Sequence, residues 1–212
     1  MRDIPFFTTE YGVAGLCLKE IPYTACAYIT ILDSSDVQEL LNEAVSFCRA
    51  AGAEQIYACG HSHLEKYPLH TIIVRMSCNK KKIPQFNATA VAVNQESMEQ
   101  WREIYNAKMH SVETAAYMSV TDCEKAVKEG KLFFVMEEGC LIGIGSVDET
   151  GIQAIASVVS GKGRVVLSSL CEKISSEIIH LDVSSQNYKA MRLYTRMGFE
   201  ESEERSRWYH IQ

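Results

Sequence analysis

The stretch from residue 152 to residue 170 constrains this chain most, because it joins an apolar run to a helical pattern through a short glycine turn. Residues 152–159 read IQAIASVV, and a nearly continuous apolar run predicts a strand buried on both faces of a sheet. The turn reads SGKGR over residues 160–164. Its glycines permit positive φ angles, and the unsatisfied N–H groups at the start of the next helix favour an anion. Lys162 and Arg164 add positive charge, so the sequence predicts an anion-binding turn.

The turn does not match the two common nucleotide-binding patterns. A P-loop needs Gly-Lys-Ser/Thr after a four-residue gap from an earlier glycine, and the sequence has none. A Rossmann motif needs a third glycine, but Val166 occupies that place, and Gly143-Ile-Gly145 in a predicted hairpin strand lacks it too. A tight structural turn is the alternative to an anion site.

A second stretch, NYKAMRLYTRMGF over residues 187–199, predicts a helix that follows a strand at residues 178–183. Positions seven apart lie almost on one helical face, so Asn187, Ala190 and Tyr194 form one stripe. Ala190 leaves room for a ligand, the Asn187 amide can anchor a polar group, and Tyr194 brings a phenol to the far end. The alternative is an amphipathic helix with Tyr194 half-buried in the core.

The two stretches together resemble the GNAT superfamily of acetyl-CoA-dependent N-acetyltransferases. The family signature at the pyrophosphate loop is Gln/Arg-x-x-Gly-x-Gly/Ala. Gly163 matches it, whereas Ser160 and Val165 stand where other residue types are usual. Many members also carry Asn-x-x-Ala-x-x-x-Tyr-x-x-x-Gly-Phe. The matching residues of this chain are Asn187, Ala190, Tyr194, Gly198 and Phe199.

The resemblance implies direct transfer of an acetyl group from acetyl-CoA, the co-substrate, to a primary amine. Strand 152–159 would pair with the pantetheine arm, and Tyr194 would protonate the departing thiolate, which is uphill by roughly 2 kcal/mol for ordinary phenol and thiol pKa values. Backbone N–H groups near Val158 or Val159 would stabilise the oxyanion. The residues implied to bind acetyl-CoA are Val158, Val159, Gly161, Lys162, Gly163, Arg164, Val165, Asn187, Ala190 and Tyr194. Asp148 and Glu149 are the nearest carboxylates for a general base, but a solvated turn is the preferred interpretation of both.

The predicted elements of residues 86–212 run β, α, α, β, β, β, α, β, α, β, which predicts an α/β (α+β) fold with a mixed, mostly antiparallel sheet flanked by helices. Residues 1–85 predict a smaller α/β unit of the order strand, strand, helix, strand, loop, strand. This order resembles the back half of an acetyltransferase, so we interpret the unit as a degenerate half-size repeat. The basic segment 78–85 (CNKKKIPQ) is the predicted boundary.

Composition excludes several classes of function. The net charge of −6 argues against non-specific nucleic-acid binding, and no apolar run is long enough to span a bilayer. Eight cysteines without a Cys-x-x-Cys pair, and no secretory signal, predict free thiols in the cytoplasm. Cys59, His61 and His63 alternate near His70, which suits zinc, but a polar loop is preferred and no metal is expected.

Two other functions compete with an active acetyltransferase. One is a catalytically weak, acetyl-CoA-binding regulatory module, which Ser160 and Val165 favour, and the other is a non-catalytic interaction domain on the same scaffold. The acceptor, a small-molecule or peptide amine, is open, as is the choice between a monomer and a homodimer.

Overall fold

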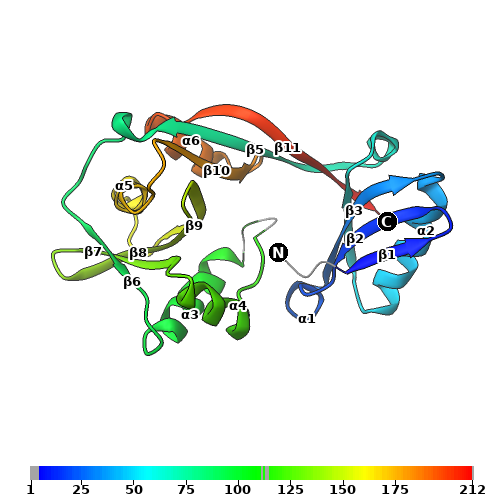
Figure 1. The fold of residues 1–212 in the computed structure, drawn as a ribbon, viewed down its shortest axis with the longest axis horizontal. Coiled ribbons are helices and arrows are strands. Elements are labelled where there is room, and N and C mark those ends of the chain that lie inside the picture. Colours follow the sequence, from blue (N-terminus) through cyan, green and yellow to red (C-terminus); the bar gives the residue numbers. More distant parts are fainter. Residues whose placement is uncertain (1–4, 111, 113–114, 212) are drawn as a thin grey trace. The chain divides into compact units, whose positions relative to one another are not determined.

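The computed structural model describes residues 5–110, 112 and 115–211 (Figure 1). They form two compact units, the first made of Met1–Ile73 and Glu204–Gln212 and the second of Val74–Glu203. The chain therefore divides inside two strands, β5 (Leu69–Asn79) and β11 (Glu200–Ile211), and not at the basic segment near residue 85. The boundary does not fall at the basic segment because Met76, Cys78 and Ile83 are buried in the core of the second unit. The lysines between them therefore belong to that unit.

The first unit contains a sheet in the order β1-β2-β3-β4-β11. Its elements are β1 (Phe6–Thr9), β2 (Gly12–Cys17), α1 (Ile21–Thr24), β3 (Cys26–Ser34), α2 (Val37–Ala50), β4 (Gln55–Cys59) and the 3-10 helix η1 (Ser62–Lys66). β3 and β4 run parallel and are joined by α2, while β11 adds antiparallel to β4. Asp36 caps α2 by accepting from the N–H groups of Gln38 and Glu39. One side of α2 packs on the buried side chains of the sheet, and the other side is exposed.

The second unit has its strands in the order β11-β5-β10-β9-β8-β7-β6. Its elements are η2 (Lys80–Lys82), β6 (Thr89–Ala92), α3 (Met98–Met109), α4 (Val120–Lys128), β7 (Leu132–Glu137), β8 (Cys140–Val147), β9 (Gly151–Ser157), α5 (Gly163–Glu172), β10 (Ile178–Ser184) and α6 (Tyr188–Arg196). Strands β6 to β9 pair antiparallel, and β9 pairs with β10 in parallel. The mixed, mostly antiparallel sheet expected from the sequence is confirmed.

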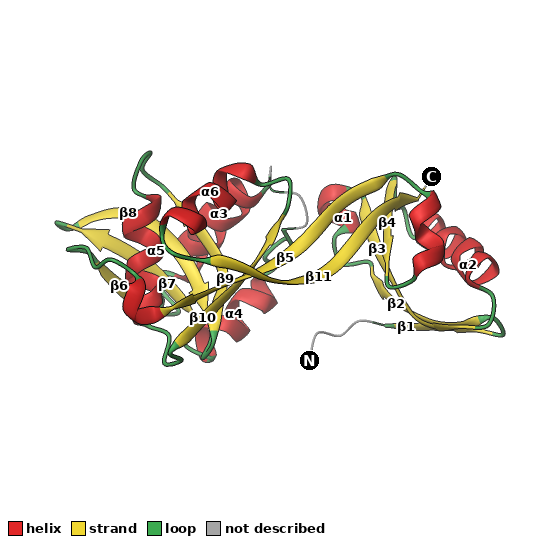
Figure 2. Cartoon of the chain, turned by 90° about the horizontal axis from the view of Figure 1, so that it is seen from above, coloured by secondary structure: helices red, strands yellow, loops and turns green. Residues whose placement is uncertain are grey.

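Helices cover both faces of this second sheet. α5 and α6 (Figures 1 and 2) share a core with β5, β9 and β10. α3 and α4 pack on the opposite face of β7 to β9, where Trp101 is completely buried. Within the described part of the chain, no helix combines the length and the apolar character that crossing a membrane requires.

Two glycines in β8 let α5 approach the sheet closely. A Cβ atom on Gly143 would lie 2.4 Å from a methyl carbon of Val166, and one on Gly145 would lie 2.2 Å from a methyl carbon of Leu170. Both distances are far shorter than a van der Waals contact. Gly143 also lies against the backbone, because its Cβ would be 2.8 Å from the carbonyl oxygen of Ala156, whereas a side chain at Gly145 would require Leu170 to move. Gly143 and Gly145 therefore allow α5 to pack closely on β8. This packing sets the position of the glycine turn that precedes α5.

Candidate active site

The central feature of the second unit is the separation of β9 from β10. In the described part of the chain the two parallel strands pair at two positions only, His180 with Gly151 and Leu181 with Ile152, which are the first two residues of β9. Gly151 permits this close start, because a Cβ there would lie 2.3 Å from the carbonyl oxygen of His180. From Gln153 onward β9 pairs with β8 alone. One edge of a central strand is therefore open beside β10, as in a wedge.

The backbone of β9 presents alternate groups to this open edge. The N–H of Val158 donates to the carbonyl oxygen of Ile142, so it points toward β8. Because successive N–H groups along a strand point to opposite sides, those of Ser157 and Ile155 point away from β8. These two residues therefore expose hydrogen-bonding backbone groups to the wedge.

The N–H groups of Val158 and Val159, expected to bind the oxyanion, are already engaged. Both donate to the Ile142 carbonyl oxygen, at 2.9 and 3.3 Å, as in a β-bulge. The strand ends at Ser157, and the chain turns away from β8 here. The bulge, invisible in the sequence, redirects these two groups. Ser157 and Ile155 are the better candidates for the role.

The glycine turn presents a cluster of N–H groups without protein acceptors. Among the described residues, no acceptor bonds the backbone N–H groups of Ser160, Gly161, Gly163, Arg164 and Val165. Gly161 has φ +82°, a conformation that favours glycine, and α5 begins at Gly163 without a side-chain cap. The first-turn N–H groups and the helix dipole together favour an anion at this end of α5. The backbone N–H of Val165 is one of these five groups. A valine where the family signature has Gly or Ala therefore leaves this N–H donor in place.

The two cations of the turn differ in their availability. The Lys162 ammonium lies 2.5 Å from a carboxylate oxygen of Glu137 at the end of β7. This ion pair neutralises much of the charge that the sequence assigned to the site. Arg164 is exposed and forms no ion pair within the described part of the chain. Arg164 is therefore the cation available to an incoming anion.

α6 approaches the start of α5 at Gly163. A Cβ on Gly163 would lie 3.1 Å from a methyl carbon of Leu193, so glycine at this position lets the two helices meet. Asn187 is the N-cap of α6, and its Oδ1 accepts from the N–H of Ala190 at 3.1 Å. The Asn187 oxygen thus caps the helix, and the NH₂ group is available as a donor to a ligand.

Tyr194 is more deeply buried than the sequence suggested. Its side chain is 7% exposed and packs in the core beneath α5 and α6, with its ring centroid 6.1 Å from that of Phe199. Desolvation by this burial raises the pKa of Tyr194 to about 12. Its hydroxyl has no hydrogen-bond partner among the described residues. The phenol is therefore a neutral donor without an acceptor, on the same helix as Asn187 and Ala190.

The sheet face opposite α5 and α6 carries a polar cluster that the sequence analysis missed. Arg75 of β5 forms two hydrogen bonds to Asp182 of β10, at 2.9 and 3.0 Å. Beside them, Ser77 Oγ lies 2.9 Å from His180 Nδ1 and 2.7 Å from Ser202 Oγ. A small hollow of about 90 Å³ opens here, lined by Arg75, Gly151, Gln153, His180 and Asp182 among others. The alternation of polar and apolar residues in β10, IIHLDVS, was the signal for this second face.

Asp148 has a structural role before β9. Its carboxylate accepts hydrogen bonds from the N–H groups of Thr150 and Gly151, both at 2.9 Å, and from Gln153 Nε2 at 2.8 Å. Burial acts to raise the pKa of Asp148, but these bonds outweigh it and hold the pKa below its usual value. A carboxylate of this kind is a weak base, in keeping with the interpretation of this segment as a turn.

The cysteine and histidines of the first unit do not form a metal site in the structure. His61 Nδ1 accepts from the N–H of His63, and His63 Nε2 lies 2.7 Å from the Lys66 ammonium. Across the described ranges, no three His, Cys, Asp or Glu side chains are grouped so that they could hold a metal ion.

Three solved structures of acetyltransferases are similar to this chain. A putative acetyltransferase from Pyrococcus horikoshii has a TM-score of 0.64 and 12% identity, covering 95% of this chain and 69% of its own. A tandem GNAT protein of the clavulanic acid biosynthesis pathway has a TM-score of 0.58 and 10% identity, with coverage of 94% and 78%. A GNAT-family acetyltransferase from Colwellia psychrerythraea has a TM-score of 0.55 and 11% identity, with coverage of 98% and 84%.

The chain therefore has the fold of the GNAT acetyltransferases, as its resemblance to the family implied. No protein-family model matches the sequence, and no curated protein matches it. At identities of 10 to 12%, the similarity defines the fold and leaves the chemistry to be argued from the site.

Proposed function

We propose that this protein is an N-acetyltransferase that moves an acetyl group directly from acetyl-CoA to a primary amine. The observation that carries the proposal is the open edge of β9 beside β10, which ends at a turn with five N–H groups that no described residue accepts from. An extended arm can add to such an edge as a strand would, and a diphosphate can lie on such a turn. Acetyl-CoA has both parts in one molecule.

The pantetheine arm would lie along β9 from Gln153 to Ser157, and the diphosphate on the N–H groups of Gly161, Gly163, Arg164 and Val165. The Arg164 guanidinium would add a charge-assisted bond to a phosphate oxygen. The NH₂ group of Asn187 and the small side chain of Ala190 would border the arm on the α6 side. The N–H of Ile155 or Ser157 would stabilise the oxyanion of the tetrahedral intermediate.

Tyr194 would donate its proton to the thiolate that leaves. The phenol is protonated at neutral pH because burial raises its pKa to about 12. No residue that the structure describes offers it a competing acceptor. The acceptor amine would approach from the other face of the sheet, where His180 and its serine partners could take up the proton that the amine loses. In this arrangement acetyl-CoA and the acceptor amine reach the wedge from opposite faces of the sheet.

The first experiment measures binding and turnover. Acetyl-CoA at millimolar concentration should raise the melting temperature, and CoA release with a panel of amines should identify the acceptor class. No thermal shift would reject the proposal, and binding without release by any amine would favour the regulatory module instead.

A matched pair of ligands tests the binding mode. Arg164→Met should weaken acetyl-CoA binding about three- to tenfold, since one exposed charge-assisted contact is lost. Acetyl-pantetheine lacks the diphosphate, so its affinity should not change in this variant. Equal losses for both ligands would contradict the placement of the diphosphate.

The role of His180 can be separated from simple acceptor binding. His180→Gln should lower kcat, with the acetyl-CoA affinity unchanged. A change in the acceptor KM alone would assign His180 to acceptor binding.

A further inference from the structure

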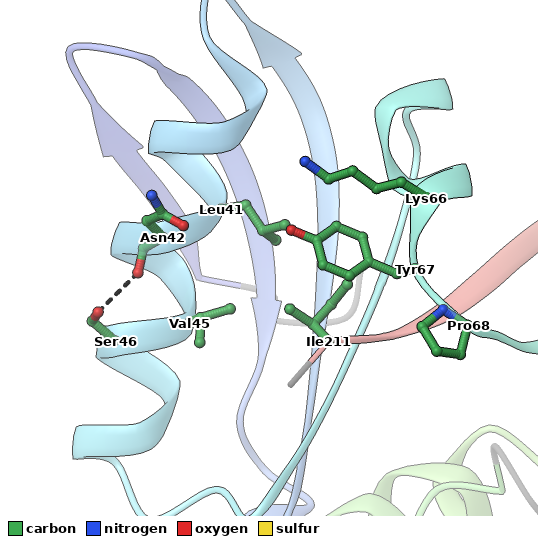
Figure 3. Close-up of a pocket in the computed structure, with 8 residues that line it drawn as sticks. All are labelled: Leu41, Asn42, Val45, Ser46, Lys66, Tyr67, Pro68 and Ile211. Atoms are coloured by element: carbon green, nitrogen blue, oxygen red, sulfur yellow. Dashed lines mark hydrogen bonds between the residues drawn. The ribbon is translucent and has the colours of Figure 1, made fainter.

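The first unit contains a groove whose chemistry is unrelated to the wedge between β9 and β10. It has a volume of about 550 Å³, within the usual range for small-molecule sites. One wall is α2, and the other is the end of η1 with the segment that follows it, together with the end of β11 (Figure 3). Its lining residues are Leu41, Asn42, Val45, Ser46, Lys66, Tyr67, Pro68 and Ile211.

The floor of the groove is apolar and firmly placed. Leu41 is 1% exposed and Ile211 is 3% exposed, and both belong to the core of the first unit. Val45 and the Tyr67 ring pack against the same core and border the floor. The groove therefore offers a ligand an apolar surface that the folded core holds in place.

The polar groups above this floor are hydrogen-bond donors. Figure 3 shows the Lys66 ammonium and the Tyr67 hydroxyl both extending toward α2, with the Tyr67 hydroxyl beside Leu41 and the Asn42 amide on α2 itself. The Asn42 oxygen is occupied by Gln38 Nε2 at 2.9 Å, which leaves the Asn42 NH₂ group. Neither this NH₂ group nor the Tyr67 hydroxyl has an acceptor in the described part of the chain.

The charge of Lys66 has no carboxylate partner among the residues that the structure describes. Its ammonium contacts Gln38 Oε1 and His63 Nε2, and it lies 5.2 Å from the centroid of the Tyr67 ring. An ammonium without a carboxylate partner, in a groove that two further donors also line, is complementary to an anion. A single lysine matches a singly charged group better than a phosphate dianion.

We propose that this groove binds a small monocarboxylate with an aliphatic or arylalkyl body. The carboxylate would accept from Lys66, Tyr67 and Asn42, and the apolar body would lie on Leu41, Val45 and Ile211. The inference rests on residues of the first unit only, so it stands or falls independently of acetyl transfer.

Octanoate is the probe, with octanol and octylamine as neutral and cationic analogues of equal chain length. In methyl-labelled full-length protein, octanoate should shift the signals of Leu41, Val45 and Ile211. Its affinity should exceed that of octanol about fivefold, as expected for one solvent-screened charge contact. Octylamine should bind most weakly. Equal affinity for octanoate and octanol, shifts confined to methyl groups of the second unit, or no shifts at 10 mM would overturn the proposal.

Three variants locate the site. Lys66→Met should reduce octanoate affinity to that of octanol, whereas Lys128→Met, at an exposed lysine of α4, should leave it unchanged. Ser46→Trp should obstruct the groove from its exposed rim and abolish binding of both ligands, without disturbing the core. Octanoate affinity that survives either Lys66→Met or Ser46→Trp would refute the assignment.

Discussion

Replacing Tyr194 by phenylalanine tests the proposed chemistry directly, because the structure separates its effect on stability from its effect on catalysis. The hydroxyl has no hydrogen-bond partner among the described residues, and the side chain is 7% exposed. Removing the hydroxyl therefore costs no protein hydrogen bond, and phenylalanine suits the apolar site at least as well. We expect the melting temperature to stay within about 2 °C of the wild-type value or to rise. A loss of activity would then reflect the reaction.

The size of the catalytic effect depends on the difference in pKa between the phenol and the leaving thiol. Against a thiol in water, with a pKa of about 8.5, the Tyr194 pKa of about 12 makes proton transfer uphill by roughly 5 kcal/mol. This exceeds the roughly 2 kcal/mol that ordinary pKa values suggest. Burial has the same effect on thiols, however, and it raises the pKa of Cys171 to about 12 and that of Cys123 to about 11.

A CoA sulfur that leaves beside Tyr194 would be desolvated in the same way. The difference in pKa then falls to about one unit or less, which corresponds to at most about 1.4 kcal/mol. Proton transfer from Tyr194 is therefore feasible while water is excluded from the wedge.

The assay is CoA release at saturating acetyl-CoA with an accepted amine. We expect Tyr194→Phe to lower kcat by about 100-fold, as for loss of a general acid, with the acetyl-CoA affinity unchanged. Because the pKa is raised, Tyr194 keeps its proton until the pH approaches 12, so wild-type kcat should not decline between pH 8 and pH 10. Unchanged kcat in the variant would remove Tyr194 from the acid role. A wild-type decline centred near pH 10, absent from the variant, would refute the desolvation argument.

Three further substitutions test the surroundings of the site. Gly145→Ala should destabilise the protein by about 1–3 kcal/mol in urea unfolding, because its Cβ would lie 2.2 Å from Leu170, and Leu170→Ala should partly restore it. Glu137→Gln should tighten acetyl-CoA binding two- to threefold by calorimetry, because it frees the Lys162 ammonium; weaker binding would mean that Glu137 positions Lys162. Gly163→Val should weaken acetyl-CoA binding and lower the melting temperature, because Leu193 must move; wild-type affinity would place the cofactor elsewhere.

Local patterns in the sequence were sufficient for the elements around the site. The apolar run before the glycine turn became β9, the SGKGR turn led into α5, and the Asn187 stretch became α6. Each prediction rested on neighbouring residues, whose periodicity and capping chemistry fix local backbone conformation. The mixed sheet followed from the order of these elements, and the similarity to acetyltransferase structures confirms the fold.

Features that depend on contacts distant in sequence could not be obtained in this way. The ion pair of Lys162 with Glu137 and the polar cluster of Arg75, Asp182 and His180 join residues 25 to 107 positions apart, and no local pattern encodes such pairings. The role of Gly143-Ile-Gly145 in seating α5 became visible only when the helix was packed on β8.

The sequence by itself determined the strand, the glycine turn and the helix with its tyrosine, because backbone conformation and amphipathic periodicity are local properties. Tertiary structure alone decided which groups at that site are available for chemistry. It engaged the N–H groups of Val158 and Val159 in a bulge, paired Lys162 with Glu137, and left Arg164 exposed. It also buried Tyr194 and so raised its pKa. Burial, and partners that folding brings from other parts of the chain, determine whether each of these groups is available to a ligand.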